Sequence, residues 1–181
     1  MTPRDDSGPD NLVNALHSKR LNFKPIDSIH AAKLYEALHH PSVHQFIDSK
    51  DFLTLQSVID FIHRVGRGPK ENSNDDWINI VCFLNDEVIG LIQATIHGTW
   101  AEVAFLFSPT FQGKGYASEA VTWMIDHIRA TRSIREFWAS TVPENERSIA
   151  LLLRTGFLES KSLDREPLSY APGDLVFERH R

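Results

Sequence analysis

The segment with the clearest chemical potential is a short glycine-containing stretch between an apolar run and an amphipathic helix. It comprises Gln112, Gly113, Lys114, Gly115, Tyr116 and Ala117. Glycines allow backbone dihedrals that other residues avoid, and they let a ligand approach the main chain closely. Free amide groups at a helix start, supported by the helix dipole, form a site for a phosphate anion. The stretch is therefore a candidate phosphate cradle.

A helix from about residue 116 to residue 130 is predicted directly after the two glycines. Its apolar residues recur at the helical period, which indicates one buried face. They are Ala117, Ala120, Val121, Met124, Ile125 and Ile128. Burial of this face would hold the start of the helix beside the glycines.

Two other kinds of phosphate-binding loop also contain glycines at such a position. A Walker-type loop needs a further upstream glycine and a Lys-Ser/Thr pair at its end, whereas Ser118 lies too far from Lys114. A Rossmann loop should lie near the first strand of a nucleotide-binding unit, whereas this stretch follows the fourth predicted strand. The sequence disfavours both, while a tight strand-to-helix turn that binds nothing stays open.

The elements that would position this stretch are predicted in the order strand, two helices, three strands, helix, strand, helix, two strands. Turn residues and apolar periodicity place them as follows. The strands lie near residues 21–26, 77–84, 88–97, 100–108, 137–141, 157–162 and 175–178. The first helix carries residues 31–38 and the second begins at Thr54. The third helix runs over residues 116–130, and the fourth follows Asn145.

The connections predict an α+β (mixed α/β) fold with a mixed, mostly antiparallel sheet of about seven strands flanked by helices. Residues 85–87 join two strands as a hairpin, which demands antiparallel pairing. The strand-helix-strand unit over residues 100–141 needs a crossover, which favours parallel pairing. Residues 1–18 are expected to form a flexible tail, and residues 19–181 a single domain.

Three motifs in order resemble those of the GNAT superfamily of N-acetyltransferases. Residues 112–117 resemble its (Gln/Arg)-x-x-Gly-x-(Gly/Ala) signature, and residues 118–120 continue it as in the RimJ/RimL-like branch. Residues 101–105 resemble that branch's Ala-Glu-Ile-Gly-Tyr strand, with Ala104 and Phe105 in place of Gly-Tyr. Residues 143–150 and 156–157 extend the resemblance, which covers roughly residues 20 to 178.

This resemblance implies a GNAT-like fold with a splayed parallel pair of strands in the centre, and acetyl-CoA as co-substrate. The pantetheine arm would lie in the splay and bond to the main chain of Phe105, Leu106 and Phe107. The diphosphate would rest on the amides from Gly113 to Ala117. No metal is implied, and the nine histidines show no ligand spacing.

Direct acetyl transfer to a primary amine requires a neutral amine, a polarised thioester carbonyl and a proton for the departing thiolate. Glu102 is the leading candidate base, directly or through water, because a carboxylate inside an apolar strand is costly unless it is solvated or used. An ordinary outward-facing residue stays the alternative. Glu87 and His97 are weaker candidates.

Asn145 and Ser148 open the last predicted helix. Their local roles would be an N-cap and a residue that supports the first turn. The resemblance places Asn145 near the pantetheine, and it makes Ser148 a hydrogen-bond partner of the CoA sulfur and a candidate proton donor.

The acceptor amine is not defined by any motif. The RimJ/RimL-like branch implies a protein or peptide N-terminal α-amine; a polyamine, an amino acid or an antibiotic is the alternative. The first two helices, residues 68–76, Trp77 and Trp100 should form the acceptor pocket. Rival functions are a non-catalytic CoA-binding regulatory domain and an unrelated phosphate- or nucleotide-binding domain.

Composition narrows the partners and the compartment. The 181 residues are 41% hydrophobic and 24% charged, with a formal net charge of −5, which disfavours nucleic acid and anionic membranes as partners. The single cysteine, Cys82, excludes an internal disulfide and reads as a core residue. No leader-like or bilayer-spanning stretch is recognised, so a cytoplasmic protein is expected. A homodimer is compatible with the sequence, which leaves the oligomeric state open.

Overall fold

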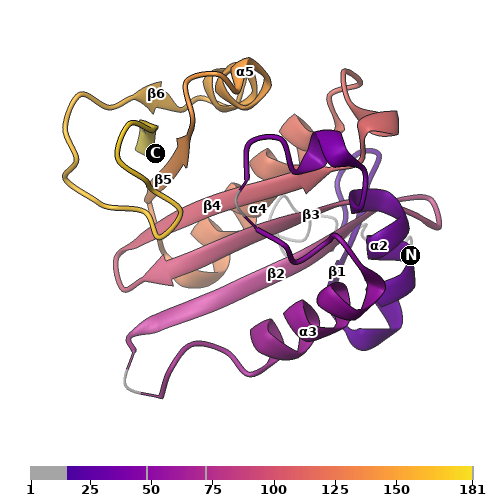
Figure 1. Cartoon of the computed structure of the whole chain (residues 1–181). Coiled ribbons are helices and arrows are strands. Elements are labelled where there is room, and N and C mark those ends of the chain that lie inside the picture. The colour runs from indigo at the N-terminus through magenta and orange to yellow at the C-terminus, as the bar shows by residue number, and fades with distance from the viewer. Residues whose placement is uncertain (1–15, 48, 72, 181) are drawn as a thin grey trace, which may run out of the picture.

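The protein is built on a seven-stranded sheet with the strand order β1-β2-β3-β4-β5-β7-β6 (Figure 1). The computed structural model describes residues 16–47, 49–71 and 73–180. The strands are β1 (Asn22–Pro25), β2 (Asp75–Leu84), β3 (Glu87–His97), β4 (Trp100–Phe107), β5 (Glu136–Thr141), β6 (Leu158–Glu159) and β7 (Leu175–His180). The helices are α2 (Ala31–Leu38), α3 (Leu55–Gly66), α4 (Tyr116–Arg132) and α5 (Glu146–Arg154), with short 3-10 turns η1 (Ser28–His30), η2 (Pro41–Val43) and η3 (Pro109–Phe111).

The sheet is mixed, which confirms the predicted fold class. β4 and β5 run parallel and are joined by α4, whereas the other neighbouring strands pair antiparallel. The elements follow the predicted order. β2 begins earlier than predicted because Asp75 pairs with His97 across the hairpin. The strand expected near residues 157–162 is limited to Leu158–Glu159, where it pairs with β7.

Helices cover both faces of the sheet, and each face has its own core. α2 and α3 lie in front of the sheet in Figure 1, and α4 lies behind it. Successive strand residues point to opposite faces. Along β4, Ala101, Val103 and Phe107 therefore pack in the core with α4, while Leu106 packs against the smaller core under α2 and α3.

Side-chain caps explain where two of the helices begin. Thr54 accepts a hydrogen bond from the Ser57 amide at 3.0 Å, and Asn145 accepts one from the Ser148 amide at 3.2 Å. Both contacts satisfy amides that a helix start leaves unpaired, as predicted for these residues. At the start of α4, Gly115 adopts φ 79° and provides no side-chain cap.

The parallel pair in the middle of the sheet separates along its length. β4 and β5 pair only at Trp100, Ala101 and Glu102, which face Glu136, Phe137 and Trp138. Beyond these residues the two strands continue without pairing, so β4 has an open edge from Val103 onward. This is the splay that the resemblance implied.

The N-terminal segment contacts the domain as soon as the described residues begin. The expected tail lies outside the described residues up to residue 15, and Ser18 hydrogen bonds to Glu119 on α4. Among the helices of the described chain, none combines the length and apolar character needed to cross a bilayer.

Candidate active site

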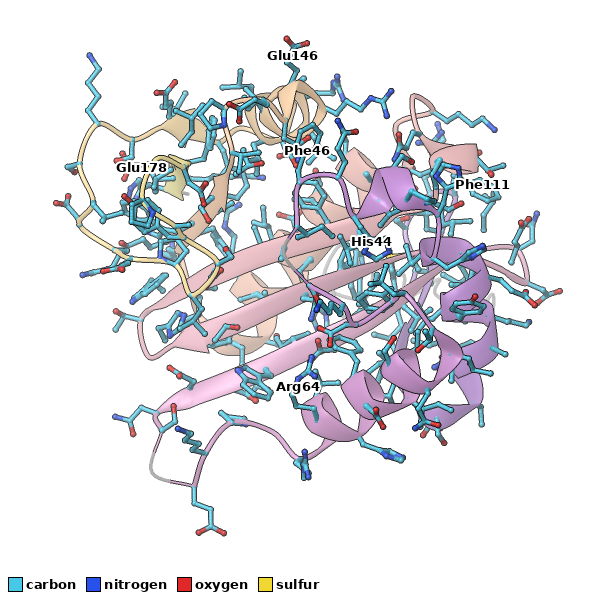
Figure 2. All side chains as sticks on the ribbon, viewed as in Figure 1. His44, Phe46, Arg64, Phe111, Glu146 and Glu178 are labelled. Carbon is cyan, nitrogen blue, oxygen red and sulfur yellow. The ribbon has the colours of Figure 1, made fainter. Side chains whose placement is uncertain are left out.

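A continuous cleft of about 1970 Å³ runs from the face of the sheet covered by α2 and α3 through the splay to the start of α4. Figure 2 shows Phe46 and Arg64 on that face. All the cofactor-binding and catalytic residues predicted from the sequence line this cleft: Glu102, Phe105, Leu106, Phe107, Gln112, Gly113, Lys114, Gly115, Tyr116, Ala117, Asn145 and Ser148. Glu87 lies outside it, at the β2–β3 hairpin.

The glycine stretch leaves a set of amide groups free at one end of the cleft. Gly113 and Gly115 adopt φ values of 75° and 79°, a region that side chains make costly. Within the described chain, none of the amides from Gly113 to Ala117 donates a hydrogen bond to protein. A Cβ on Gly113 would find nothing within 4 Å, so the concave side is open. The geometry fits an anion held by main-chain groups and the start of α4.

Side chains from α5 brace this stretch and add positive charge. Arg147 donates from Nη1 to Gln112 Oε1 at 2.7 Å, and Gln112 donates from Nε2 to the Phe107 carbonyl at 3.3 Å. Arg154 donates to the Ser118 hydroxyl at 3.3 Å. The two guanidinium groups therefore lie beside the glycine stretch and add positive charge near the free amides.

The open edge of β4 presents alternate main-chain groups to the splay. The Ser108 amide donates to the Ile89 carbonyl on β3 at 2.9 Å. Because such bonds alternate along an antiparallel ladder, Leu106 also faces β3, while Phe105 and Phe107 direct their amide and carbonyl groups away from it. The Phe107 carbonyl already accepts from Gln112. Phe105 therefore offers the least encumbered main-chain groups of the predicted set.

Glu102 is buried, with 4% of its surface exposed, on the side of β4 that faces α2 and α3. Its Oε2 accepts from the Leu168 amide at 2.6 Å. Its Oε1 accepts from the Ser169 amide at 3.0 Å and from the Ser169 hydroxyl at 2.5 Å. Three donors compensate for the burial of the carboxylate. Glu102 also holds the segment around Leu168 against the cleft.

His97 lies next to Glu102, but its ring contacts Asp75 and Trp100. Its Nδ1 is 2.8 Å from Asp75 Oδ1, and its ring stacks on Trp100 with centroids 4.1 Å apart. Its Nε2 is 3.8 Å from Glu102 Oε2 and has no hydrogen-bond partner in the described chain. His97 therefore lies beside Glu102 but does not line the cleft.

Ser148 and Asn145 lie on the α5 side of the cleft. The Ser148 amide is used by the Asn145 cap, but its hydroxyl has no hydrogen-bond partner among the residues described. The hydroxyl is thus available to a ligand. Cys82, by contrast, is fully buried on β2, and burial raises the pKa of its thiol, so it stays a core residue.

The floor of the cleft includes polar residues that the sequence did not single out. Strand register places Trp77, Thr95 and Glu102 in one row across β2, β3 and β4, and Asn79, Gln93 and Ala104 in the next. Gln93 donates from Nε2 to Asn79 Oδ1 at 2.7 Å. Because successive strand residues point to opposite faces, the sequence of β2 or β3 alone can indicate which of its residues share a face. Only the strand register shows that Thr95, Asn79 and Gln93 lie on the same part of the sheet as Glu102.

Comparisons with known proteins agree with this geometry. A family model described as the acetyltransferase (GNAT) domain matches residues 20–158. The chain is 26% identical over 148 residues to the uncharacterized N-acetyltransferase p20 of Bacillus licheniformis, covering 80% of this chain and 83% of that protein.

Solved structures share the fold at low identity. The RimL ribosomal L7/L12 α-N-protein acetyltransferase in complex with coenzyme A superposes with a TM-score of 0.74 and 19% identity, over 90% of this chain and 95% of that one. The spermidine N-acetyltransferase of Vibrio cholerae, in complex with CoA and spermine, gives 0.66 and 15%, over 89% and 94%.

Proposed function

Since the chain belongs to the GNAT acetyltransferases, in the RimJ/RimL type, and is an acetyl-CoA-dependent N-acetyltransferase, we propose that it acetylates the N-terminal α-amine of a protein or peptide. The observation that carries the cofactor part of this proposal is the row of free amides from Gly113 to Ala117 at one end of the cleft. These amides would hold the diphosphate of acetyl-CoA. The open edge of β4 would receive the pantetheine arm.

The thioester would then lie between the β4 edge and α5. A main-chain amide of that edge, with Phe105 the best placed, would polarise the thioester carbonyl. The amine nitrogen attacks this carbonyl directly, a C–N bond forms and the C–S bond breaks. No covalent bond to the protein is needed.

Two side chains would transfer the protons of the reaction, one as acceptor and one as donor. Glu102 accepts the proton that the amine loses, through a water molecule, because both of its oxygens already bond to residues 168–169. Ser148 donates the proton that the thiolate gains and recovers one from solvent. The unpartnered hydroxyl of Ser148 in the cleft supports this assignment.

Two arguments favour an α-amine over a polycation. On the face covered by α2 and α3, Asp51 is already paired with Arg64 at 2.7 Å and is not left to bind an extra cationic group. An α-amine titrates at about 7.7–8.0 and a lysine amine at about 10.4, so an α-amine demands far less of a base near neutral pH. The structural likeness to the RimL ribosomal L7/L12 α-N-protein acetyltransferase points the same way.

A free-thiol assay with acetyl-CoA tests this proposal. The acceptors are a peptide with a free N-terminal serine and one internal lysine, the same peptide with a blocked N-terminus, and spermidine. We expect thiol release with the free peptide alone, and a mass shift located at its first residue. A higher kcat/KM with spermidine, or acetylation of the blocked peptide at lysine, would contradict the α-amine assignment. No thiol release above hydrolysis with any amine would favour a CoA-binding regulatory domain.

A further inference from the structure

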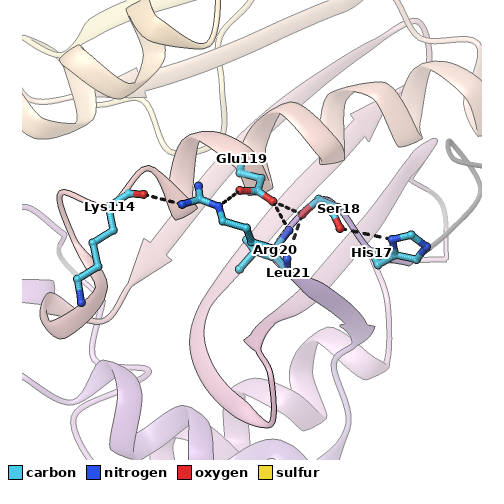
Figure 3. Close-up of polar contacts among 6 residues, drawn as sticks. All are labelled: His17, Ser18, Arg20, Leu21, Lys114 and Glu119. Carbon is cyan, nitrogen blue, oxygen red and sulfur yellow. Dashed lines mark hydrogen bonds and ion pairs between the residues drawn. The ribbon is translucent and has the colours of Figure 1, made fainter.

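A residue outside the cleft makes several contacts with the outer side of the glycine stretch. Arg20 lies just before β1, and Figure 3 shows its guanidinium between Glu119 and the Lys114 carbonyl. Its Nε donates to Glu119 Oε2 at 2.6 Å, and its Nη1 donates to the Lys114 carbonyl at 3.0 Å. The guanidinium also stacks over the Tyr116 ring at 4.5 Å. One side chain thus joins three positions around the start of α4.

The contact with the Lys114 carbonyl sets the direction of the next amide. In a planar trans peptide, the carbonyl of one residue and the N–H of the following residue point in opposite directions. Because Arg20 draws the Lys114 carbonyl outward, the Gly115 N–H is turned away from Arg20. The same orientation is compatible with the φ of 79° at Gly115, whose Cβ position is 3.5 Å from Arg20 Nη2. Arg20 therefore holds the Lys114–Gly115 peptide from the side opposite to the N–H that would face the anion.

The ion pair between Arg20 and Glu119 would reduce a charge repulsion between Glu119 and a diphosphate. Glu119 lies in the first turn of α4, where its carboxylate would repel a diphosphate on the neighbouring amides. Partial burial opposes ionisation of Glu119, but hydrogen bonds from Ser18 and Arg20 and the charge of Arg20 outweigh this and lower the pKa of the carboxyl. Glu119 is thus ionised near neutral pH, and the guanidinium 2.6 Å away neutralises it.

We propose that Arg20 is a positioning residue for diphosphate binding: it fixes the Lys114–Gly115 peptide with its N–H toward the ligand and neutralises Glu119 beside the anion. This inference rests on the proposed function, since it assumes that acetyl-CoA binds at this stretch. Arg20 acts through the loop and does not touch the reacting atoms.

The test compares two acetyl donors. Acetyl-CoA carries the diphosphate, whereas acetyl-pantetheine ends before it. In an Arg20→Met enzyme, we expect kcat/KM for acetyl-CoA to fall by about tenfold, the loss of one charge-assisted hydrogen bond. The kcat at saturating acetyl-CoA and the kcat/KM for acetyl-pantetheine should stay within about twofold of the wild type, because the acyl end of the cleft is unchanged.

Two further variants make the result decisive. Arg132→Met removes another ion-paired arginine of comparable exposure at the far end of α4, where Arg132 bonds Asp76 at 2.8 Å, and it should leave both donors unaffected. Arg20→Lys, which keeps the charge but not the fork that bonds two acceptors at once, should lose an intermediate amount and serves if Arg20→Met does not fold.

The outcomes are distinguishable. Wild-type use of acetyl-CoA by Arg20→Met, or an equal loss with both donors, would overturn the inference alone. A wild-type protein that fails to bind CoA in a calorimetric titration would overturn the inference and the proposed function together.

Discussion

A carboxylate buried in a sheet must be compensated, and at Glu102 the compensation comes from a distant segment. Ser169 and Leu168 supply all three of its donors. Glu102 anchors that segment at the cleft and, in the proposed mechanism, also receives a proton through water. These two roles can be separated by experiment because only the second depends on the carboxylate's basicity.

A Glu102→Gln enzyme should show kcat reduced by about 100-fold, the usual contribution of a general base. Its affinity for CoA should stay unchanged, because the free amides lie at the other end of the cleft. Steady-state kinetics and calorimetry measure the two quantities. Ser169→Ala is the control: it removes one donor but keeps the carboxylate, so kcat should change only a few-fold. Equal losses in the two variants would assign Glu102 to loop anchoring alone.

Replacing Ser148 by alanine should lower kcat by about 100-fold while the helix start persists, since the cap uses the Ser148 main-chain amide. Single-turnover thiol release measures this effect. Ser118→Ala removes another hydroxyl from the same cleft, one that already bonds Arg154, and should leave kcat unchanged. Unaltered turnover in Ser148→Ala would remove Ser148 from the mechanism.

At the scale of the elements, the start of α4 is the feature on which the proposed cofactor binding depends. A Gly115→Val substitution forces a β-branched residue to φ 79°, at a cost of about 1–2 kcal/mol or a rearranged loop. We expect CoA affinity to fall at least about tenfold, because a rearranged loop no longer directs its amides at one anion. Lys114→Ala should change affinity only about twofold, since the main chain is kept. Isothermal titration calorimetry measures both.

Gly98→Val is the matched control for the Gly115→Val substitution. Gly98 has φ 67° in the β3–β4 turn, so the substitution is equally strained but distant from the amides. An equal loss of CoA affinity in Gly98→Val would show that general destabilisation explains the result.

The capping box of the 3-10 turn η1, formed by Asp27 and His30 just before α2, should make stability depend on pH. Burial of the His30 ring lowers its pKa from the ordinary 6.5, although the charge of Asp27 partly opposes this. Neutral Nδ1 accepts from the Asp27 amide at 3.0 Å, which a protonated ring cannot do. Because the folded pKa is depressed, this stabilisation is complete above pH 6.5 and is lost as the pH falls toward the folded pKa.

The free energy of unfolding should therefore fall between pH 7 and pH 5 in urea titrations, and less steeply in His30→Gln, which keeps a neutral acceptor in the capping box. His63→Gln, an exposed position on α3, is the control and should keep the wild-type slope. Identical slopes in wild type and His30→Gln would contradict the role of His30.

The elements that the sequence predicted well are those whose signals are local. Thr54, Asn145 and the glycines at 113 and 115 each lie within a few residues of a helix start. The strand-helix-strand order over residues 100–141 indicates that β4 and β5 pair in parallel. The partners of Glu102 were not foreseeable, because Leu168 and Ser169 lie 66 and 67 positions away in a segment without periodicity. The cleft floor at Asn79 and Gln93 depends on strand register, which periodicity does not determine.

At the scale of the whole molecule, the site is a convergence of segments that are far apart in the chain. Arg20 meets Lys114 across 94 positions, and Arg147 meets Gln112 across 35. β4 and β5 stay unpaired beyond Glu102, and the opening between them joins the free amides in one continuous cleft.

The central claim is that the main chain at the start of α4 binds the diphosphate of acetyl-CoA. A crystal structure of the protein with CoA tests it most directly. We expect phosphate oxygens within hydrogen-bond distance of the amides between Gly113 and Ala117, with the pantetheine arm between β4 and β5. CoA bound elsewhere, with these amides turned toward protein acceptors, would contradict the account.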